Sequence, residues 1–287
     1  MPVQSGGSWT ESLESETSAS AISFFEQTTA IRRTAEDRFT AALDPAWWVV
    51  RGPHGGYLSA IILRALTEGL DDATRPIRSF TTHFVAAPKS GDLDIEVKLE
   101  RAGRSMSFMT ARADQDGKPM AMALAAFSAE WPGLSFDNAP MPEVGSPDEG
   151  FPVPIEGDQV PAFLKNFDMR WTIGDPPFTG SKKAELGGWF RMRDTVVADA
   201  CVVACLLDAW APAIFPIATQ PVVAPTIDLT MHFRTPLPLP DAKPEDFFLG
   251  RFHSSLGREG FFEEDGEMWT QDGRLVAQSR QLALGLT

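Results

Sequence analysis

The pattern of hydrophobic and polar positions divides the chain into two similar series of elements. Two apolar stretches have the length and spacing of helices, GGYLSAIILRALTEGL at 55–70 and ADACVVACLLDAWAP at 198–212. Runs of alternating or continuous apolar residues, separated by turn residues, follow each helix and are typical of strands. The expected strands are 92–102, 105–115 and 119–131, then 246–256, 260–271 and 274–286. The pattern predicts an α+β fold in which an antiparallel sheet wraps each helix.

Short shared motifs show that the second series repeats the first. His-Phe occurs at 83–84 and 232–233, Gly-Arg at 103–104 and 257–258, and Gln-Asp-Gly at 115–117 and 271–273. The pairs keep the same order, with separations of 149, 154 and 156 residues. This spacing predicts a tandem duplication. Two such units placed side by side would give one continuous sheet with both helices on the same side.

The segments outside the repeats are polar. Residues 132–167 are rich in Pro, Gly and acids and have no hydrophobic period, so they are expected to link the repeats. Residues 169–174 and 187–194 have the pattern of strands that open the second unit. We expect a flexible N-terminal segment at 1–33, with its first twenty or so residues mobile, repeats at 34–131 and 168–287, and the linker at 132–167.

Composition narrows the class of protein. A hydrophobic content of 43% is normal for a globular chain. No run of about 18 apolar residues occurs, and the N-terminus lacks the pattern of a secretory signal, so we expect a cytoplasmic protein without a membrane span. The net charge of −14 argues against nucleic acid or an anionic membrane as partner. An anionic small molecule stays compatible, because Arg78, Arg101 and Arg104 cluster in the first half, although they could equally be solvated strand ends.

The cysteines and histidines do not suggest a metal site. Cys201 and Cys205 lie four residues apart in an apolar helical pattern, which predicts buried free thiols. The four histidines, His54, His83, His232 and His253, lack the spacing of metal ligands. We therefore expect no metal and no cofactor.

Five stretches carry a resemblance to a known family: GGYLSAIILRA, HFVAAP, ERAGRSMSF, APTIDLTMHFR and EMWTQDGRLVAQSRQLAL. In this order and spacing, over most of residues 34–287, the chain resembles the acyl-CoA thioesterase II family. The resemblance implies a double hot-dog fold, hydrolysis of acyl-CoA to free acid and CoA, and Asp208, Thr226 and Gln281 as catalytic residues. The proline-broken segment PAIFPIATQPVVA and the strand TIDLTMHFR differ from the better-known members, so the acyl chain length stays open.

The second repeat alone carries this polar set. Aligning the repeats places Leu63 or Ser59 opposite Asp208, Ile77 opposite Thr226, and Leu124 or Ala125 opposite Gln281. Two copies of one fold would form two potential sites, and only one of them has an acid, a hydroxyl and an amide together. A functional site explains this difference more easily than packing does.

The first repeat contributes the sequence GPHGG directly before its helix. Glycines permit close approach to a ligand, and the first amides of a helix carry partial positive charge. These are the properties of an oxyanion hole. We expect one composite site in which Asp208 is the general base or an orienting group for water, Thr226 and Gln281 hold the water, and the amide of Gly55 or Gly56 faces the oxyanion. The expected substrate-binding residues are His54, Gly55, Gly56 and Tyr57.

Other interpretations are open at this stage. Asp208 could be an exposed or capping acid, Thr226 an ordinary strand residue, and Gln281 a solvent-facing one. GxSxG is absent and no cysteine has a catalytic signature beside a histidine, so a covalent nucleophile is not indicated. The alternatives are a non-catalytic acyl-CoA or lipid-binding protein and, less favoured, a hydratase or dehydratase, whose D-x-N-x-x-H string is missing. We expect a homodimer or homotetramer.

Overall fold

The computed structural model describes residues 22–157 and 160–286. The predicted mobility of the first twenty residues concerns residues outside this range. The first repeat contains, in chain order, α1 (Phe24–Thr28), β1 (Arg32–Ala35), β2 (Arg38–Leu43), the 3-10 turn η1 (Pro45–Trp47), α2 (Gly55–Leu70), β3 (Ile77–Phe84), β4 (Gly91–Ala102), β5 (Met106–Gln115) and β6 (Lys118–Ser128). The linker and second repeat contain η2 (Pro147–Glu149), β7 (Phe151–Pro152), η3 (Ala162–Asn166), β8 (Phe167–Gly174), β9 (Glu185–Met192), α3 (Ala200–Leu206), β10 (Thr226–Phe233), β11 (Phe248–His253), β12 (Gly257–Arg258), β13 (Phe261–Thr270) and β14 (Leu275–Leu284).

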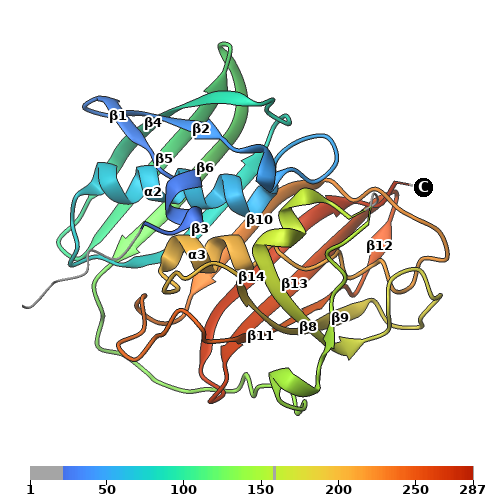
Figure 1. Cartoon of the computed structure of the whole chain (residues 1–287). Helices are drawn as coiled ribbons and strands as arrows, with labels where there is room; N and C mark the ends of the chain where they lie inside the picture. Colours follow the sequence, from blue (N-terminus) through green and yellow to red (C-terminus); the bar gives the residue numbers. More distant parts are fainter. Residues whose placement is uncertain (1–21, 158–159, 287) are drawn as a thin grey trace, which may run out of the picture.

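The described strands form one antiparallel sheet that runs through both repeats. Its order is β1-β2-β4-β5-β6-β3-β10-β14-β13-β11-β9-β8-β7, with β12 attached to β13. Helices α2 and α3 pack against each other on the same side of this sheet (Figure 1). The predicted α+β architecture of a double hot-dog, with one continuous sheet, is therefore confirmed. Within the described residues, no helix is long and apolar enough to cross a membrane.

The repeats meet at the pairing of β3 with β10. Thr81 lies opposite Thr230 in this pairing, and the two hydroxyl oxygens are 3.0 Å apart. These threonines are separated by 149 residues, the same spacing as the two His-Phe motifs. An approximate two-fold axis therefore passes through this pair. Both strands also have an irregularity at their start, after Ile77 in β3 and after Thr226 in β10, so the repeats agree in detail.

The two predicted helices differ in outcome. Helix α2 spans the predicted residues 55–70, and most of its side chains are buried because helix α3 covers one side and the sheet another. Helix α3 spans only Ala200–Leu206, so the predicted helix at 198–212 is too long. Its chain tightens into a turn after Leu206, where Asp208 N–H donates to Cys205 O and Ala209 N–H to Leu206 O. Asp208 therefore follows the helix and is not inside it.

Part of the segment 1–33, which we expected to be flexible, has regular structure. Residues within the proposed flexible segment 1–33 form α1 and begin β1. The Ser23 side chain and Glu26 form a capping box, and Phe25 is buried against Trp47. This short helix carries one anchoring aromatic residue, which gives too little periodicity for detection from the sequence.

The linker packs against the second repeat. Trp189 Nε1 donates to Gly145 O, and Trp269 Nε1 donates to Ala139 O, so two strands hold the linker backbone. The end of the linker forms η3, and Phe163 in this turn stacks on His54, the residue that caps the start of α2. The exact domain boundaries stay a prediction.

Candidate active site at the start of helix α2

The site begins where the first turn of α2 meets the turn after α3. Gly56 N–H donates to Asp208 Oδ2 over 2.7 Å. A Cβ atom at Gly56 would lie 2.6 Å from Cys205 O, and one at Gly55 would lie 2.9 Å from Asp208 Oδ2. Only glycine permits this approach, so the Gly-Gly pair is explained by the contact between the two repeats.

His54 contacts both sides of this junction. Its Nδ1 accepts from Tyr57 N–H at 3.2 Å and caps α2, so the ring proton is on Nε2. Nε2 lies 2.7 Å from Asp208 O and 3.3 Å from Asp208 Oδ2. The ring is 3% exposed and stacks on Phe163 at 4.7 Å. His54 is thus positioned to orient the Asp208 turn, and its contact with substrate stays a prediction.

The structure places a cysteine beside this histidine, which the sequence did not indicate. Cys205 Sγ is 4.0 Å from His54 Nδ1. Burial raises the pKa of the Cys205 thiol well above its usual range, and the Asp208 charge raises it further. A buried, protonated thiol is a poor nucleophile, so the pair does not resemble an activated Cys-His site. Both Cys201 and Cys205 are buried and free, as predicted.

Tyr57 is used inside the protein. It is fully buried and stacks on Trp47 with ring centroids 5.0 Å apart. Its hydroxyl donates to Thr28 O and accepts from Asp44 N–H. Contact of Tyr57 with substrate stays a prediction, and this packing argues against it.

The electrostatics of Asp208 suit a base. Burial raises the pKa of the Asp208 carboxyl, while His54 and the Gly56 N–H partly oppose this shift. A carboxylate held in this way accepts a proton more readily than an exposed one. The Gly55 N–H has no acceptor within the described residues, whereas that of Gly56 is occupied by Asp208. The Gly55 amide is therefore the free donor at this end of the helix.

Thr226 and Gln281 are joined on the sheet. Thr226 Oγ1 donates to Gln281 Oε1 at 2.7 Å, and Gln281 Nε2 donates to Glu264 Oε1 at 2.6 Å. Glu264 Oε2 accepts from Ala213 N–H at 2.5 Å. No hydrogen bond among the described residues joins Asp208 to Thr226 or Gln281. Burial raises the pKa of the Glu264 carboxyl, and the charge of Asp208 raises it further. The chain of Thr226, Gln281 and Glu264 is joined through Ala213 to the segment that follows Asp208.

Sequence reasoning missed Glu264. It stands in the run FFEEDGE, where acidic neighbours suggest a solvated strand face. In the structure it is 4% exposed and lies opposite Gln281 in the pairing of β13 with β14. The available signal was the strand alternation, which puts Glu264 on the same face as the apolar Phe262 and Met268.

The strand register identifies the equivalent residues of the first repeat. Leu229 pairs with Gln281 as Phe80 pairs with Ala125, and Gln281 pairs with Glu264 as Ala125 pairs with Met109. The equivalent of Thr226 is Ile77, and the helix caps at His54 and Asp199 make Leu63 the equivalent of Asp208. The first repeat thus has four buried apolar residues, Leu63, Ile77, Met109 and Ala125, where the second has its polar set. The fold does not require polar residues at these positions.

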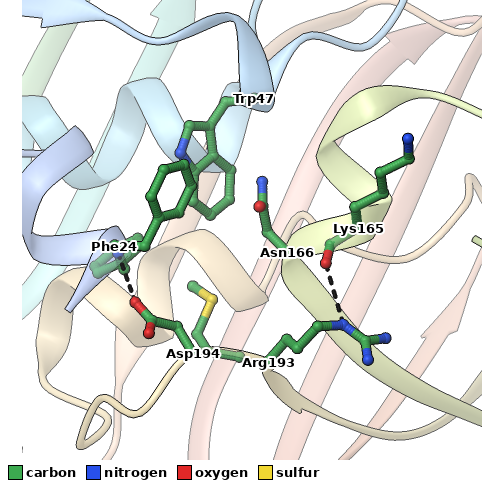
Figure 2. Close-up of a pocket in the computed structure, with 8 residues that line it drawn as sticks. Phe24, Trp47, Lys165, Asn166, Arg193 and Asp194 are labelled. Carbon is green, nitrogen blue, oxygen red and sulfur yellow. Dashed lines mark hydrogen bonds between the residues drawn. The ribbon is translucent and has the colours of Figure 1, made fainter.

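A separate cavity of about 280 Å³ opens between α1 and the second repeat (Figure 2). Asp194 accepts from the Phe25 N–H there, and Arg193 donates to Lys165 O. Trp47 lines this cavity and touches Phe167, which touches His54. The cavity contains none of the predicted catalytic residues. Within the described part of the chain, no three His, Cys, Asp or Glu side chains are grouped as a metal site needs.

Family models match both halves of the chain. Residues 44–128 match the acyl-CoA thioesterase N-terminal domain, and residues 137–284 match the acyl-CoA thioesterase C-terminal domain. None of the curated proteins matches the sequence.

Solved structures with the same fold cover nearly the whole chain. A conserved hot dog fold protein of unknown function from Alicyclobacillus acidocaldarius has a TM-score of 0.82 at 23% identity, covering 92% of this chain and 98% of its own. A putative thioesterase II from Thermobifida fusca has a TM-score of 0.80 at 24% identity, covering 93% and 99%. The acyl-CoA thioesterase II TesB2 from Mycobacterium marinum has a TM-score of 0.72 at 19% identity, covering 91% and 97%. By its two matched domains, which together span more than half of its residues, the chain belongs to the acyl-CoA thioesterase family.

Proposed function

We propose that this protein hydrolyses acyl-CoA to free acid and CoA with a water molecule activated by Asp208. The observation that carries the proposal is the difference between equivalent positions, which are polar in the second repeat and occupied by buried apolar residues in the first. Burying an acid, an amide and a hydroxyl costs free energy that the first repeat avoids. A catalytic role accounts for that cost, and the family membership supplies the class of reaction.

The chemical steps follow from the groups present. Water attacks the thioester carbonyl carbon as Asp208 accepts its proton, and the carbonyl oxygen becomes an oxyanion. The Gly55 N–H, which has no acceptor among residues 22–157 and 160–286, is the donor for that charge at the positive end of α2. The tetrahedral intermediate then expels the CoA thiolate, which takes up the proton from Asp208.

The remaining residues have supporting roles in this proposal. Thr226 and Gln281 hold the attacking water, and His54 orients the Asp208 turn. Gly56 binds Asp208 directly, through the 2.7 Å hydrogen bond, and so fixes the base relative to the helix end. The buried thiol of Cys205 has no part in the reaction.

Thiol release from a series of short, long and branched acyl-CoA substrates tests the proposal. We expect wild type to release CoA and Asp208→Asn, confirmed to be folded, to lose about 100-fold or more in kcat. Asp228→Asn is the matched control, because Asp228 carries the same group on β10 but lies beside the exposed His83. Tight acyl-CoA binding without thiol release would refute hydrolysis and leave a binding protein with this fold.

A further inference from the structure

Glu264 is a buried carboxylate with two donors and no cation. Its two oxygens accept from Gln281 Nε2 and Ala213 N–H, and among the described residues no Lys or Arg pairs with it. A buried carboxylate is costly unless it is paired or strongly hydrogen-bonded. The first repeat places Met109 at the equivalent position, which shows that the sheet packs well without an acid there.

An ionised carboxylate fixes the direction of the neighbouring amide. Because Glu264 can only accept, Gln281 must present its NH₂ group to it, and Gln281 Oε1 then faces Thr226. The Thr226 hydroxyl has a single proton, which it donates to this oxygen. Thr226 Oγ1 is thereby left with lone pairs alone for any further partner.

We infer that Glu264 is a positioning residue for hydrolysis, which sets the direction of the hydrogen bonds through Gln281 and Thr226 so that Thr226 accepts a proton from the attacking water. The inference rests on the proposed function. A water that donates one hydrogen to Thr226 and the other to Asp208 keeps a lone pair free for the carbonyl carbon. If the amide of Gln281 were reversed, Thr226 would donate to the water, which would occupy one of the water's two lone pairs and make it a poorer nucleophile.

The second bond of Glu264 links this chain of residues to the base. Ala213 is fully buried and lies five residues after Asp208, in the segment that leaves α3. By holding the Ala213 N–H, Glu264 ties that segment to β13. One side chain thus connects the strand that carries Gln281 with the turn that carries Asp208.

An exchange of the two side chains tests the direction of the hydrogen bonds. In Glu264→Gln, the new amide can satisfy Ala213 with its oxygen only by turning its NH₂ toward Gln281, whose amide must then reverse. In the double variant Glu264→Gln/Gln281→Glu, the new amide donates to the new carboxylate, which accepts from Thr226 as Gln281 did. The double variant keeps the net charge and restores the direction at Thr226.

The first readout is the rate of thiol release at pH 8. Glu264 is ionised at this pH, because burial raises its pKa only to about 7. We expect Glu264→Gln and Gln281→Glu each to lower kcat by about 10- to 100-fold with little change in KM, and the double variant to recover at least about tenfold. The control is Glu267→Gln, the same substitution on the alternate face of β13, which should keep the wild-type kcat. Wild-type kcat in Glu264→Gln, or a double variant no better than the single ones, would overturn the inference.

Thermal unfolding provides a readout that does not depend on activity. Gln281→Glu alone places two carboxylates at the 2.6 Å contact and should lower Tm by about 5 °C, and Glu264→Gln added to it should recover most of that loss. Absence of this recovery would show that the two side chains do not form the contact and would overturn the inference. If wild type releases no thiol, the proposed function fails. If wild type is active and Glu264→Gln is equally active, only the role of Glu264 fails.

Discussion

Replacing Gly56 by alanine tests the junction between the repeats directly. The added Cβ would lie 2.6 Å from Cys205 O, 2.8 Å from His54 Cε1 and 3.0 Å from Asp208 Cβ. A backbone carbonyl cannot rotate away as a side chain can, so α2 must withdraw from α3. That movement lengthens the hydrogen bond from Gly56 N–H to Asp208 and carries the Gly55 amide away from the base.

The expected loss of stability combines three effects. Overpacking costs about 1–3 kcal/mol, and weakening a hydrogen bond to a carboxylate costs about 1.5 kcal/mol. Alanine in a helix stabilises the protein by about 1 kcal/mol relative to glycine. The net change in the free energy of unfolding is about 2.5 kcal/mol, which lowers Tm by about 4 °C in a chain of 287 residues. Displacement of the base by a few tenths of an ångström or more should lower kcat by about 10- to 100-fold.

Thermal unfolding and thiol release from acyl-CoA measure these two changes. Gly133→Ala is the control, because a Cβ there meets no atom within 4 Å. It should leave both Tm and kcat at their wild-type values. Wild-type Tm and kcat in Gly56→Ala as well would show that the close approach of the repeats does not position the base.

Three further predictions address other parts of the site. Thr226→Val should lower kcat by about 10- to 100-fold, whereas Thr226→Ser, which keeps the hydroxyl, should retain most of it; equal losses would show that the hydroxyl is not used. Because burial raises the pKa of Glu264 from 4.5 to about 7, its carboxyl holds a proton more tightly in the folded state. Relative to Glu264→Gln, wild type should therefore lose on the order of 3 kcal/mol of stability as the pH rises from 4.5 to about 7. Urea unfolding of both proteins at several pH values measures this difference. A difference in unfolding free energy that does not change with pH would contradict the prediction. Phe163→Ala removes the ring stacked on His54 and should cost about 3 kcal/mol in urea unfolding, together with a fall in kcat; an unchanged kcat would show that His54 needs no support from the linker.

The sequence predicted the fold well because its signal is periodic and occurs twice. Helix α2 and the long strands have strong patterns, and the repeated motifs predicted the single sheet. Helix α3 was predicted too long because apolar composition continues past Leu206, while the turn that ends the helix is set by contacts with α2. Composition carries no information on contacts between segments about 150 residues apart.

The candidate site was predictable only in part for the same reason. The glycines before α2 and the polar residues of the second repeat could be found by comparing the repeats. Glu264 escaped because its acidic neighbours suggested solvent, and its burial depends on the partner strand that places Gln281 opposite it. The stacking of Phe163 on His54 joins the linker to the site, and no local pattern indicates that packing.

The pairing of Thr81 with Thr230 has a consequence for stoichiometry and concentration. Two separate copies of one repeat would form a symmetric assembly with two identical sites, and dilution would separate the copies and abolish both. Here the copies are joined covalently, so their effective concentration does not depend on how dilute the protein is. Each chain should therefore turn over substrate at a rate independent of protein concentration and titrate with one equivalent of a tight-binding inhibitor. The covalent link also lets Met109 and Ala125 be selected for packing alone, because a change at either is not copied to Glu264 or Gln281 in the second repeat.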